Sequence, residues 1–360
     1  MKKTLVALAA LAVVGAASAQ STVTLFGSID ASVGVRELRQ TGVVPGSVGS
    51  LDAGPEVMSG QQNGSRWGMR GTEDLGGGMK ANFNLTNGFN IDTATLAQGG
   101  RIFGREAWVG LSGGFGAITL GRQVTIMANG PYAITGGYAN YDAWTSTTGN
   151  GGGLGGAGTS GFGNSASIAQ DNVRKDNSIQ YQTPAMGGFV GTVMWAPGEN
   201  GVSAGLSNTN YWSLGLGYVN GPIGIQFAYE SDKVAGAALA PSVAGLNQKA
   251  WALGASYNFG VATVSGSYER ASLGTVDDKG WAMGLSAPLG PVSLDFEYAR
   301  EKTTTAGAFA SKANAINFRV NYPLSKRTKV YALISDGNSN TGVVGRQSMN
   351  RYLVGMRHVF

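Results

Sequence analysis

Short segments in which apolar and polar side chains alternate recur along almost the whole chain. The final ten residues, RYLVGMRHVF, show the pattern clearly: Tyr352, Val354, Met356 and Phe360 alternate with smaller or polar residues, and the chain stops on the phenylalanine. A period of two is typical of β-strands, whose successive side chains point to opposite faces of the sheet. A chain that keeps this period through many segments is restricted to an all-β fold.

Sixteen such segments are found after residue 21. In several of them carboxylates stand between apolar neighbours, as Asp295 and Glu297 do on either side of Phe296. One face of each strand must therefore meet water while the other meets an apolar environment. The expected strands cover residues 22–35, 65–71, 79–86, 103–111, 117–122, 177–182, 189–195, 211–218, 223–229, 250–258, 261–269, 281–286, 292–298, 315–321, 329–334 and 351–360.

Alternation alone also fits a soluble β-sandwich, in which the apolar face points inward. The placement of the aromatic residues favours a membrane barrel instead, because many of them fall near strand ends on the apolar face, where transmembrane barrels carry aromatic girdles. Glycine accounts for 59 of the 360 residues and charged residues for 13%. We therefore predict a 16-stranded antiparallel transmembrane β-barrel. The aromatic residues in question are Trp212, Tyr218, Phe227, Tyr229, Trp251, Phe259, Trp281, Tyr298 and Tyr322.

The N-terminus has the features of a secretory signal peptide. Lys2 and Lys3 precede an apolar run over residues 5–14, and the small residues Ala17 and Ala19 follow. The run is shorter than the ~20 residues that a membrane-spanning helix needs. We expect cleavage after residue 19, so that residues 1–19 are the signal peptide and residues 20–360 form the barrel.

The residues needed for other classes of function are missing or scattered. The chain has no cysteine, and its one histidine, His358, lies near the C-terminus on the apolar face. A Ser/His/Asp arrangement therefore has no base, and no spacing of metal ligands is found. The net charge of +5 includes no basic run that would favour nucleic acid. We predict no enzyme activity, no cofactor and no metal site.

Several motifs resemble those of Gram-negative general porins, particularly the β-proteobacterial branch. They are QSTVTLFGSIDASVGV from residue 20, SRWGMRGTEDLGGGMKANF from residue 65, AWVGLSGGFGAITLGRQ from residue 107, RKDNSIQYQTP from residue 174, and the terminal VGMRHVF. The resemblance implies a homotrimer in the cell outer membrane that passes ions and small hydrophilic solutes. It also implies a third extracellular loop that folds into the barrel and narrows the pore.

Residues 124–173 are the candidate for this constriction loop, since they show no strand pattern and are too long for an idle connection. Residues 149–163 are nearly all small, which leaves a disordered surface loop as an alternative. The first half of the segment carries Tyr132, Tyr138 and Tyr141, which we expect to pack in the lumen. Its only acidic residues are Asp142 and Asp171.

By this resemblance, Arg66, Arg105 and Arg174 are expected to form the basic pore wall of the family. Arg36 and Arg70 share the inward parity of their strands and extend this set. Counting back along its strand puts Arg105 on the outward face, unless a bulge or a position beyond the bilayer intervenes. The alternative for each arginine is a solvated rim charge or an ion-pair partner.

Several cations facing two carboxylates predict selectivity for anions. The alternative function is an adhesin or structural barrel whose pore is plugged, with surface loops at residues 42–64 and after residue 231. By resemblance, Phe360 is the signal that the outer-membrane assembly machinery recognises. Outer-membrane lipid and lipopolysaccharide are the other expected partners.

Overall fold

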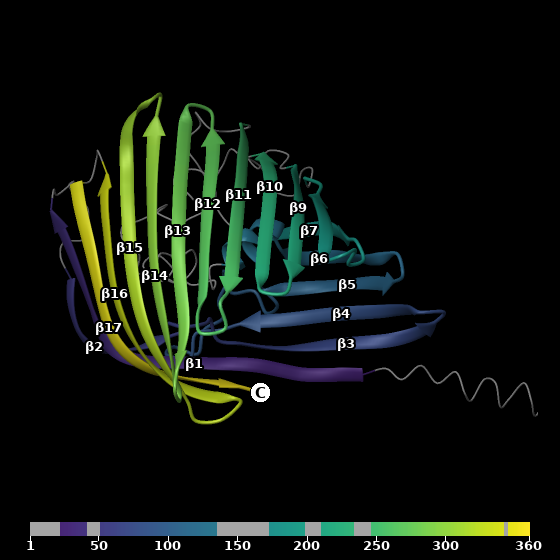
Figure 1. Ribbon diagram of the computed structural model, residues 1–360, viewed down its shortest axis with the longest axis horizontal. Coiled ribbons are helices and arrows are strands. Elements are labelled where there is room, and N and C mark those ends of the chain that lie inside the picture. The colour runs from purple at the N-terminus through teal and green to yellow at the C-terminus, as the bar shows by residue number, and fades with distance from the viewer. Residues whose placement is uncertain (1–21, 42–50, 135–172, 199–209, 234–245, 342–344) are drawn as a thin grey trace, which may run out of the picture.

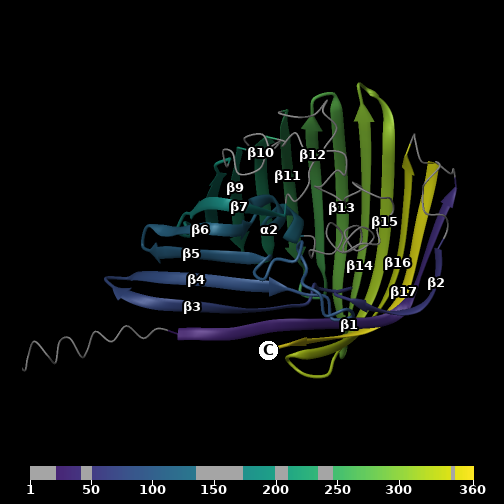
Figure 2. The same cartoon turned by 180° about the vertical axis from the view of Figure 1, so that it is seen from behind.

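The computed structural model describes residues 22–41, 51–134, 173–198, 210–233, 246–341 and 345–360. The described residues form one large antiparallel sheet with two one-turn helices, α2 and α3. In Figures 1 and 2 the strands of the near and far walls cross in projection, as strands that tilt in the same sense around a barrel do. Among the described residues no helix has the length and apolarity to cross a membrane.

Seventeen strand segments are present in the described part of the chain. Short connections at one end alternate with mostly longer ones at the other, which is the pattern of periplasmic turns and extracellular loops. The elements are β1 (Thr22–Thr41), β2 (Leu51–Ser59), β3 (Arg66–Gly76), β4 (Met79–Gly88), β5 (Glu106–Gly113), β6 (Gly116–Val124), α2 (Ile126–Asn129), α3 (Pro131–Ile134), β7 (Arg174–Gln182), β8 (Phe189–Ala196), β9 (Tyr211–Asn220), β10 (Ile223–Lys233), β11 (Asn247–Asn258), β12 (Thr263–Leu273), β13 (Val276–Leu289), β14 (Val292–Thr305), β15 (Ala308–Pro323), β16 (Thr328–Thr341) and β17 (Gly345–Val359).

The first strand explains how seventeen segments make a 16-stranded barrel. On one side β1 pairs with β17, and on the other it pairs first with β3 and then with β2. β2 and β3 thus share one strand position, and the β1–β17 pairing closes the ring. The predicted 16-stranded antiparallel barrel is confirmed.

Closure is completed by a contact between the two ends of the barrel. The backbone N–H of Gly27 donates to the Phe360 carbonyl at 2.9 Å, and the N–H of Phe360 donates back at 3.1 Å. The Phe360 ring occupies the space where a side chain at residue 27 would lie. A glycine is therefore required here for steric reasons rather than for its backbone freedom.

The outward faces are those that the alternation predicts. Val23 and Leu25 on β1 are exposed, while Ser28 and Asp30 on the opposite face are buried. Outward aromatic rings pack in pairs at one level of the wall: Trp212 with Tyr229, Trp251 with Tyr268, and Trp281 with Tyr298, with centroids 5.2, 5.4 and 5.2 Å apart. These three pairs are hereafter called the extracellular girdle.

The structure corrects several predicted boundaries. β2 lies within residues 42–64, which were expected to be a surface loop, and it pairs with β1. β13 extends well beyond the predicted residues 281–286. Conversely, residues 103–105 precede β5 instead of opening it. The ends of a strand can consist of polar residues that still form the backbone hydrogen bonds of the sheet. Such ends show no apolar–polar alternation, so the pattern underestimates the length of the strand.

Candidate functional site

A cluster of cations lies on the inner wall where β1 meets β3 and β17. Ser28 is directly opposite Arg66 on β3. From the other side of β1, Arg357 donates its Nε proton to the Ser28 hydroxyl at 3.0 Å. Lys329 on β16 is directly opposite Arg357. Three cations from three strands therefore flank the inward face of β1; we call Arg66, Arg357 and Lys329 the cationic wall.

Two further predicted arginines lie beside this wall. The Arg70 guanidinium is 5.0 Å from the centroid of the inward Phe26 ring, in a cation–π contact. Arg105 lies one residue before β5, and its side chain lies against Gly64 and Gly88. Because Gly88 is the cross-strand partner of Arg66, Arg105 reaches the same face as Arg66. Its position outside the ladder resolves the conflict with strand parity.

Arg36 has an inward position but also an ion-pair partner. Its Nε is 3.2 Å from the Glu56 carboxylate on β2. Both side chains are about one-third exposed, so the pair remains solvated. Exposed pairs of this kind neutralise charge locally and contribute at most about 1 kcal/mol.

At the start of β7 the lumenal contacts belong to Lys175 rather than to the predicted Arg174. The Lys175 Nζ is 2.5 Å from the Asp232 carboxylate and 4.9 Å from the centroid of the buried Tyr211 ring. Arg174 is buried, and strand alternation places its side chain on the opposite face from Lys175. The pore-wall role of Arg174 stays a prediction.

Arg122 has the parity of the exposed Ile118 and Leu120 on β6, which places it on the outer face. It donates to Asp176 at 2.6 Å and to the Gly104 carbonyl at 2.8 Å. Arg101 contacts the same carboxylate at 2.8 Å. A shared carboxylate therefore ties the loop before β5 to the start of β7.

The start of the predicted constriction loop packs on the inner wall. A side chain at Gly215 would collide with Ile126 of α2, and one at Gly254 would collide with Pro131 and Ile134 of α3. Gly215 and Gly254 are both inward positions, because they alternate with outward leucines. α2 packs on β8 to β10, and Figure 2 shows it in front of the strands of this part of the wall. A cavity of about 230 Å³ lies beside this contact and is lined by Ile126 and Asn129 of α2 and by Gln180, Gln182 and Gln226 of the wall.

Small residues on the wall make room for these helices. The buried cluster around Ile126 and Met127 is completed by Met194, by Tyr211, and by alanines on β8 and β10 to β12. Alanine or glycine at successive inward positions of a strand is the signal in the sequence that could have indicated a stretch of wall covered by another segment. Residues 135–172, with Tyr138, Tyr141, Asp142 and Asp171, lie outside the described residues, as does the side chain of Tyr132. The inward loop as a whole therefore stays a prediction.

A second segment enters the lumen between β2 and β3, and sequence reasoning missed it. The buried Asp30 carboxylate accepts from the backbone N–H of Gln62 at 2.8 Å, from that of Asn63 at 2.6 Å, and from the Tyr331 hydroxyl at 2.6 Å. The side-chain amide of Gln62 also donates to the side-chain oxygen of Asn321 on β15 at 2.5 Å. Residues 60–65 are thus held against the inner face of β1 and β15 to β17.

The wall formed by β12 to β14 is acidic, in contrast to that near β1. The Glu269, Asp278, Glu297 and Glu301 side chains are all inward and buried. Further down, Asp295 is paired with Arg319 at 3.0 Å. Charge is therefore divided around the lumen: cations gather near β1, β3 and β17, and carboxylates gather on β12 to β14.

Comparison with known proteins identifies the family. The model for the Gram-negative porins matches residues 4–342. The chain belongs to this family. Outer membrane porin protein 32 of Delftia acidovorans is 36% identical to this porin over 266 residues, which cover 73% of this chain and 67% of that protein. An outer membrane porin of Bordetella pertussis is 34% identical over 287 residues, covering 72% and 67%.

Solved structures agree with the fold. The anion-selective porin from Comamonas acidovorans superposes with a TM-score of 0.71 at 27% identity, covering 95% of this chain and all of that one. OmpT of Vibrio cholerae shares the fold at a TM-score of 0.66 and 14% identity, covering 96% of this chain and 100% of that chain. This porin is an outer-membrane channel whose barrel crosses the membrane many times.

Proposed function

We propose that this porin is an anion-selective diffusion channel for ions and small hydrophilic solutes. The cationic wall carries the proposal, because Arg66, Arg357 and Lys329 gather on one inner face and Arg105 and Arg70 lie beside them. In a narrow pore with low-dielectric walls, fixed charges of one sign concentrate the opposite ion. The name of the Comamonas acidovorans neighbour, an anion-selective porin, supports the same reading.

The test is the reversal potential of the purified channel across a KCl gradient in a planar bilayer. The wild-type protein should give an anion-selective potential. Arg66→Glu changes the wall by two charge units and should move the potential toward cation selectivity, while Arg66→Lys should leave its sign unchanged. Lys326→Glu makes the same charge change in an exposed turn between β15 and β16 and serves as the matched control.

A cation-selective wild-type potential, or an equal shift from Lys326→Glu, would contradict the proposal. Absence of any conductance step would favour the plugged barrel instead. The finer assignments of Arg36 and Arg174 are addressed by the same recording, since loss of either charge should shift the potential less than loss of Arg66.

Assembly as a homotrimer is part of the proposal. The outward faces of β1, β4 and β5 carry the small residues Ala31, Ala81 and Ala107, which permit close approach of another barrel. Recognition of Phe360 by the assembly machinery is a further part, supported by the position of this residue at the closing contact with Gly27.

The proposal includes no enzymatic activity. The family is one of channels. His358 lies near the end of β17, and its imidazole Nδ1 is 2.8 Å from the hydroxyl of Thr328 on β16. His358 lies on the outward face, so it faces away from the inward carboxylates. It is not placed to act as a base for them.

A further inference from the structure

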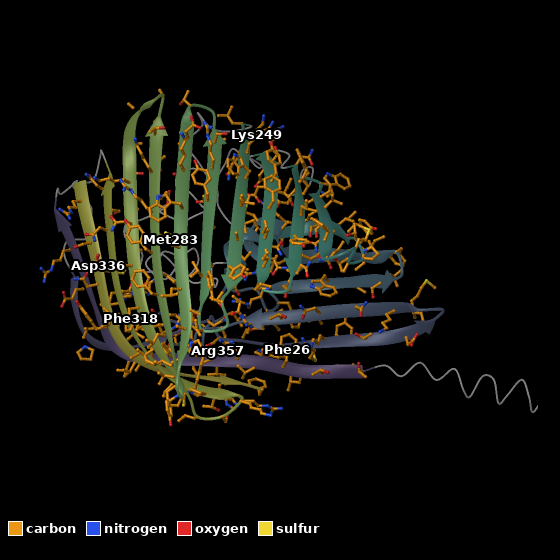
Figure 3. All side chains as sticks on the ribbon, viewed as in Figure 1. Phe26, Lys249, Met283, Phe318, Asp336 and Arg357 are labelled. Atoms are coloured by element: carbon orange, nitrogen blue, oxygen red, sulfur yellow. The ribbon has the colours of Figure 1, made fainter. Side chains whose placement is uncertain are left out.

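The cavity beside α2 differs from the rest of the inner wall, because none of the described residues that line it is charged. It lies on the inner face of β7 to β10, close to the short turn between β9 and β10. Along the sheet, β3 to β6 separate this sector from β1 on one side, and β11 to β17 separate it on the other. Arg357 of the cationic wall, by contrast, lies beside β1 (Figure 3). The lumen therefore has a third, neutral sector.

Two glycines on β9 keep the floor of this cavity open. Gly215 and Gly217 are successive inward residues of the strand. A side chain at Gly215 would collide with Ile126 of α2. One at Gly217 would lie 2.8 Å from the side-chain oxygen of Gln226 and 2.9 Å from its side-chain nitrogen. The first glycine thus admits the helix, and the second leaves room for an amide that faces the cavity.

Side-chain amides form the polar part of the lining. Gln180 and Gln182 are successive inward residues of β7, and Gln226 on β10 is the cross-strand partner of Gly217. The Gln226 amide also lies close to Gly130, at the end of α2, so it spans the gap between wall and helix. Among the residues that the structure describes, no hydrogen bond is recorded for these three amides. Each offers two donor hydrogens and an acceptor oxygen to a solute.

The lining is unfavourable for two classes of solute. An ion would lose hydration in the cavity without meeting an opposite charge, which is costly. An apolar solute would displace the water that the amides bind and leave them unpaired. An uncharged polyol meets neither penalty, because each of its hydroxyl groups both donates and accepts as an amide does. Its carbon chain can contact Val190 and Ile126, which are the apolar part of the lining.

We propose that this cavity binds small uncharged polyols as they pass through the channel. The proposal rests on the diffusion function proposed above, because the solute reaches the cavity through the lumen. The volume of about 230 Å³ equals the liquid share of about eight water molecules at ~30 Å³ each, which suits a sugar alcohol of five carbons. Binding in the lumen concentrates the polyol inside the channel, so its flux should saturate with concentration.

The test is titration of xylitol, followed by saturation-transfer NMR, against the full-length porin in detergent. Gln226→Met keeps the length of the side chain and removes its hydrogen-bonding groups. It should raise the dissociation constant about fivefold, the loss expected for one neutral hydrogen bond. Gln182→Met/Gln226→Met should raise it about 25-fold on the same basis.

A pair of glycine variants tests the shape of the site. Gly217→Ala places a methyl group against the Gln226 amide at the floor of the cavity, and it should weaken xylitol binding at least as much as Gln226→Met does. Gly191→Ala on β8 is the matched control. Gly191 alternates with the inward Val190 and so lies on the outer face, where an added methyl group meets only Thr183, at 3.4 Å and beyond. This variant should bind xylitol as the wild type does.

Two further measurements separate this site from anion selectivity. Xylonate, which carries a carboxylate in place of a terminal hydroxymethyl group, should not displace xylitol. The reversal potential of Gln226→Met should equal that of the wild type, since no charge changes. A cation-selective wild type that binds xylitol would support this site and contradict only the anion selectivity. Absence of saturable xylitol binding, equal binding by Gln226→Met and the wild type, or displacement by equimolar xylonate would each overturn the proposal.

Discussion

At the residue scale, the closing contact shows how the size of one residue is set by another far away in the chain. Gly27 and Phe360 exchange two backbone hydrogen bonds, and the phenylalanine ring covers the glycine. The sequence indicated an aromatic C-terminal strand, but it gave no sign that residue 27 is the position this ring covers. The partner became visible only when the first and last strands were paired.

Gly27→Val is expected to lower the free energy of unfolding by about 1–3 kcal/mol, because the added side chain collides with the Phe360 ring. Urea unfolding of the refolded protein in lipid vesicles measures this. Gly54→Val on β2 is the control, since a side chain there meets no atom within 4 Å.

Deleting Phe360 should reduce the yield of assembled protein without changing its reversal potential. A change of selectivity after the deletion would contradict the separation of assembly from permeation.

At the scale of elements, the inner wall of β9 to β12 and the helices α2 and α3 fit one another. Glycine and alanine at inward positions leave space that Ile126 and Ile134 fill. The sequence marked residues 124–173 as a long segment without strand pattern, but it did not show which strands the segment would touch. That contact depends on barrel curvature, which lets the helices after β6 pack on β8 to β12 along the inner wall.

Gly254→Leu should push α3 off the wall toward the lumen and lower the single-channel conductance, at a cost in stability of about 1–3 kcal/mol. Planar-bilayer recording measures the conductance. Gly266→Leu is the matched control, because a side chain there meets only the Ala282 carbonyl, at 3.5 Å. An unchanged conductance in Gly254→Leu would show that α3 is not part of the constriction of the pore.

At the scale of the whole molecule, charge is sorted both around the lumen and between the two faces of the barrel. Cations near β1 lie on the inner wall, carboxylates lie on the inner face of β12 to β14, and a second set of cations lies on the outer face of β11 to β14. Basic side chains therefore occupy both faces of the barrel, in different sectors of the wall.

A homotrimer should migrate as one large species on an SDS gel without heating and as a 36.9 kDa species or slightly below after boiling. Conductance steps should then appear in multiples of three. Chemical cross-linking in vesicles that yields only monomers would contradict the trimer.

Raising the salt concentration above about 0.1 M, where the Debye length is ~10 Å, should weaken the anion selectivity, because the added ions screen the charges of the cationic wall.

The sequence by itself determined the strands, their number and their outward face, because an alternation of period two sets which side chains share a face. It determined the membrane through the aromatic residues near strand ends on the apolar face. Arg66 and Arg70 were placed inward by this local rule, and Arg105 was not, since it lies outside the ladder. Tertiary structure alone decided the contacts on the inner wall: residues 60–65 on Asp30, α3 on Gly254, and Arg357 beside Arg66. Such contacts join segments that are distant in sequence, and their geometry follows from closure and tilt rather than from any local pattern.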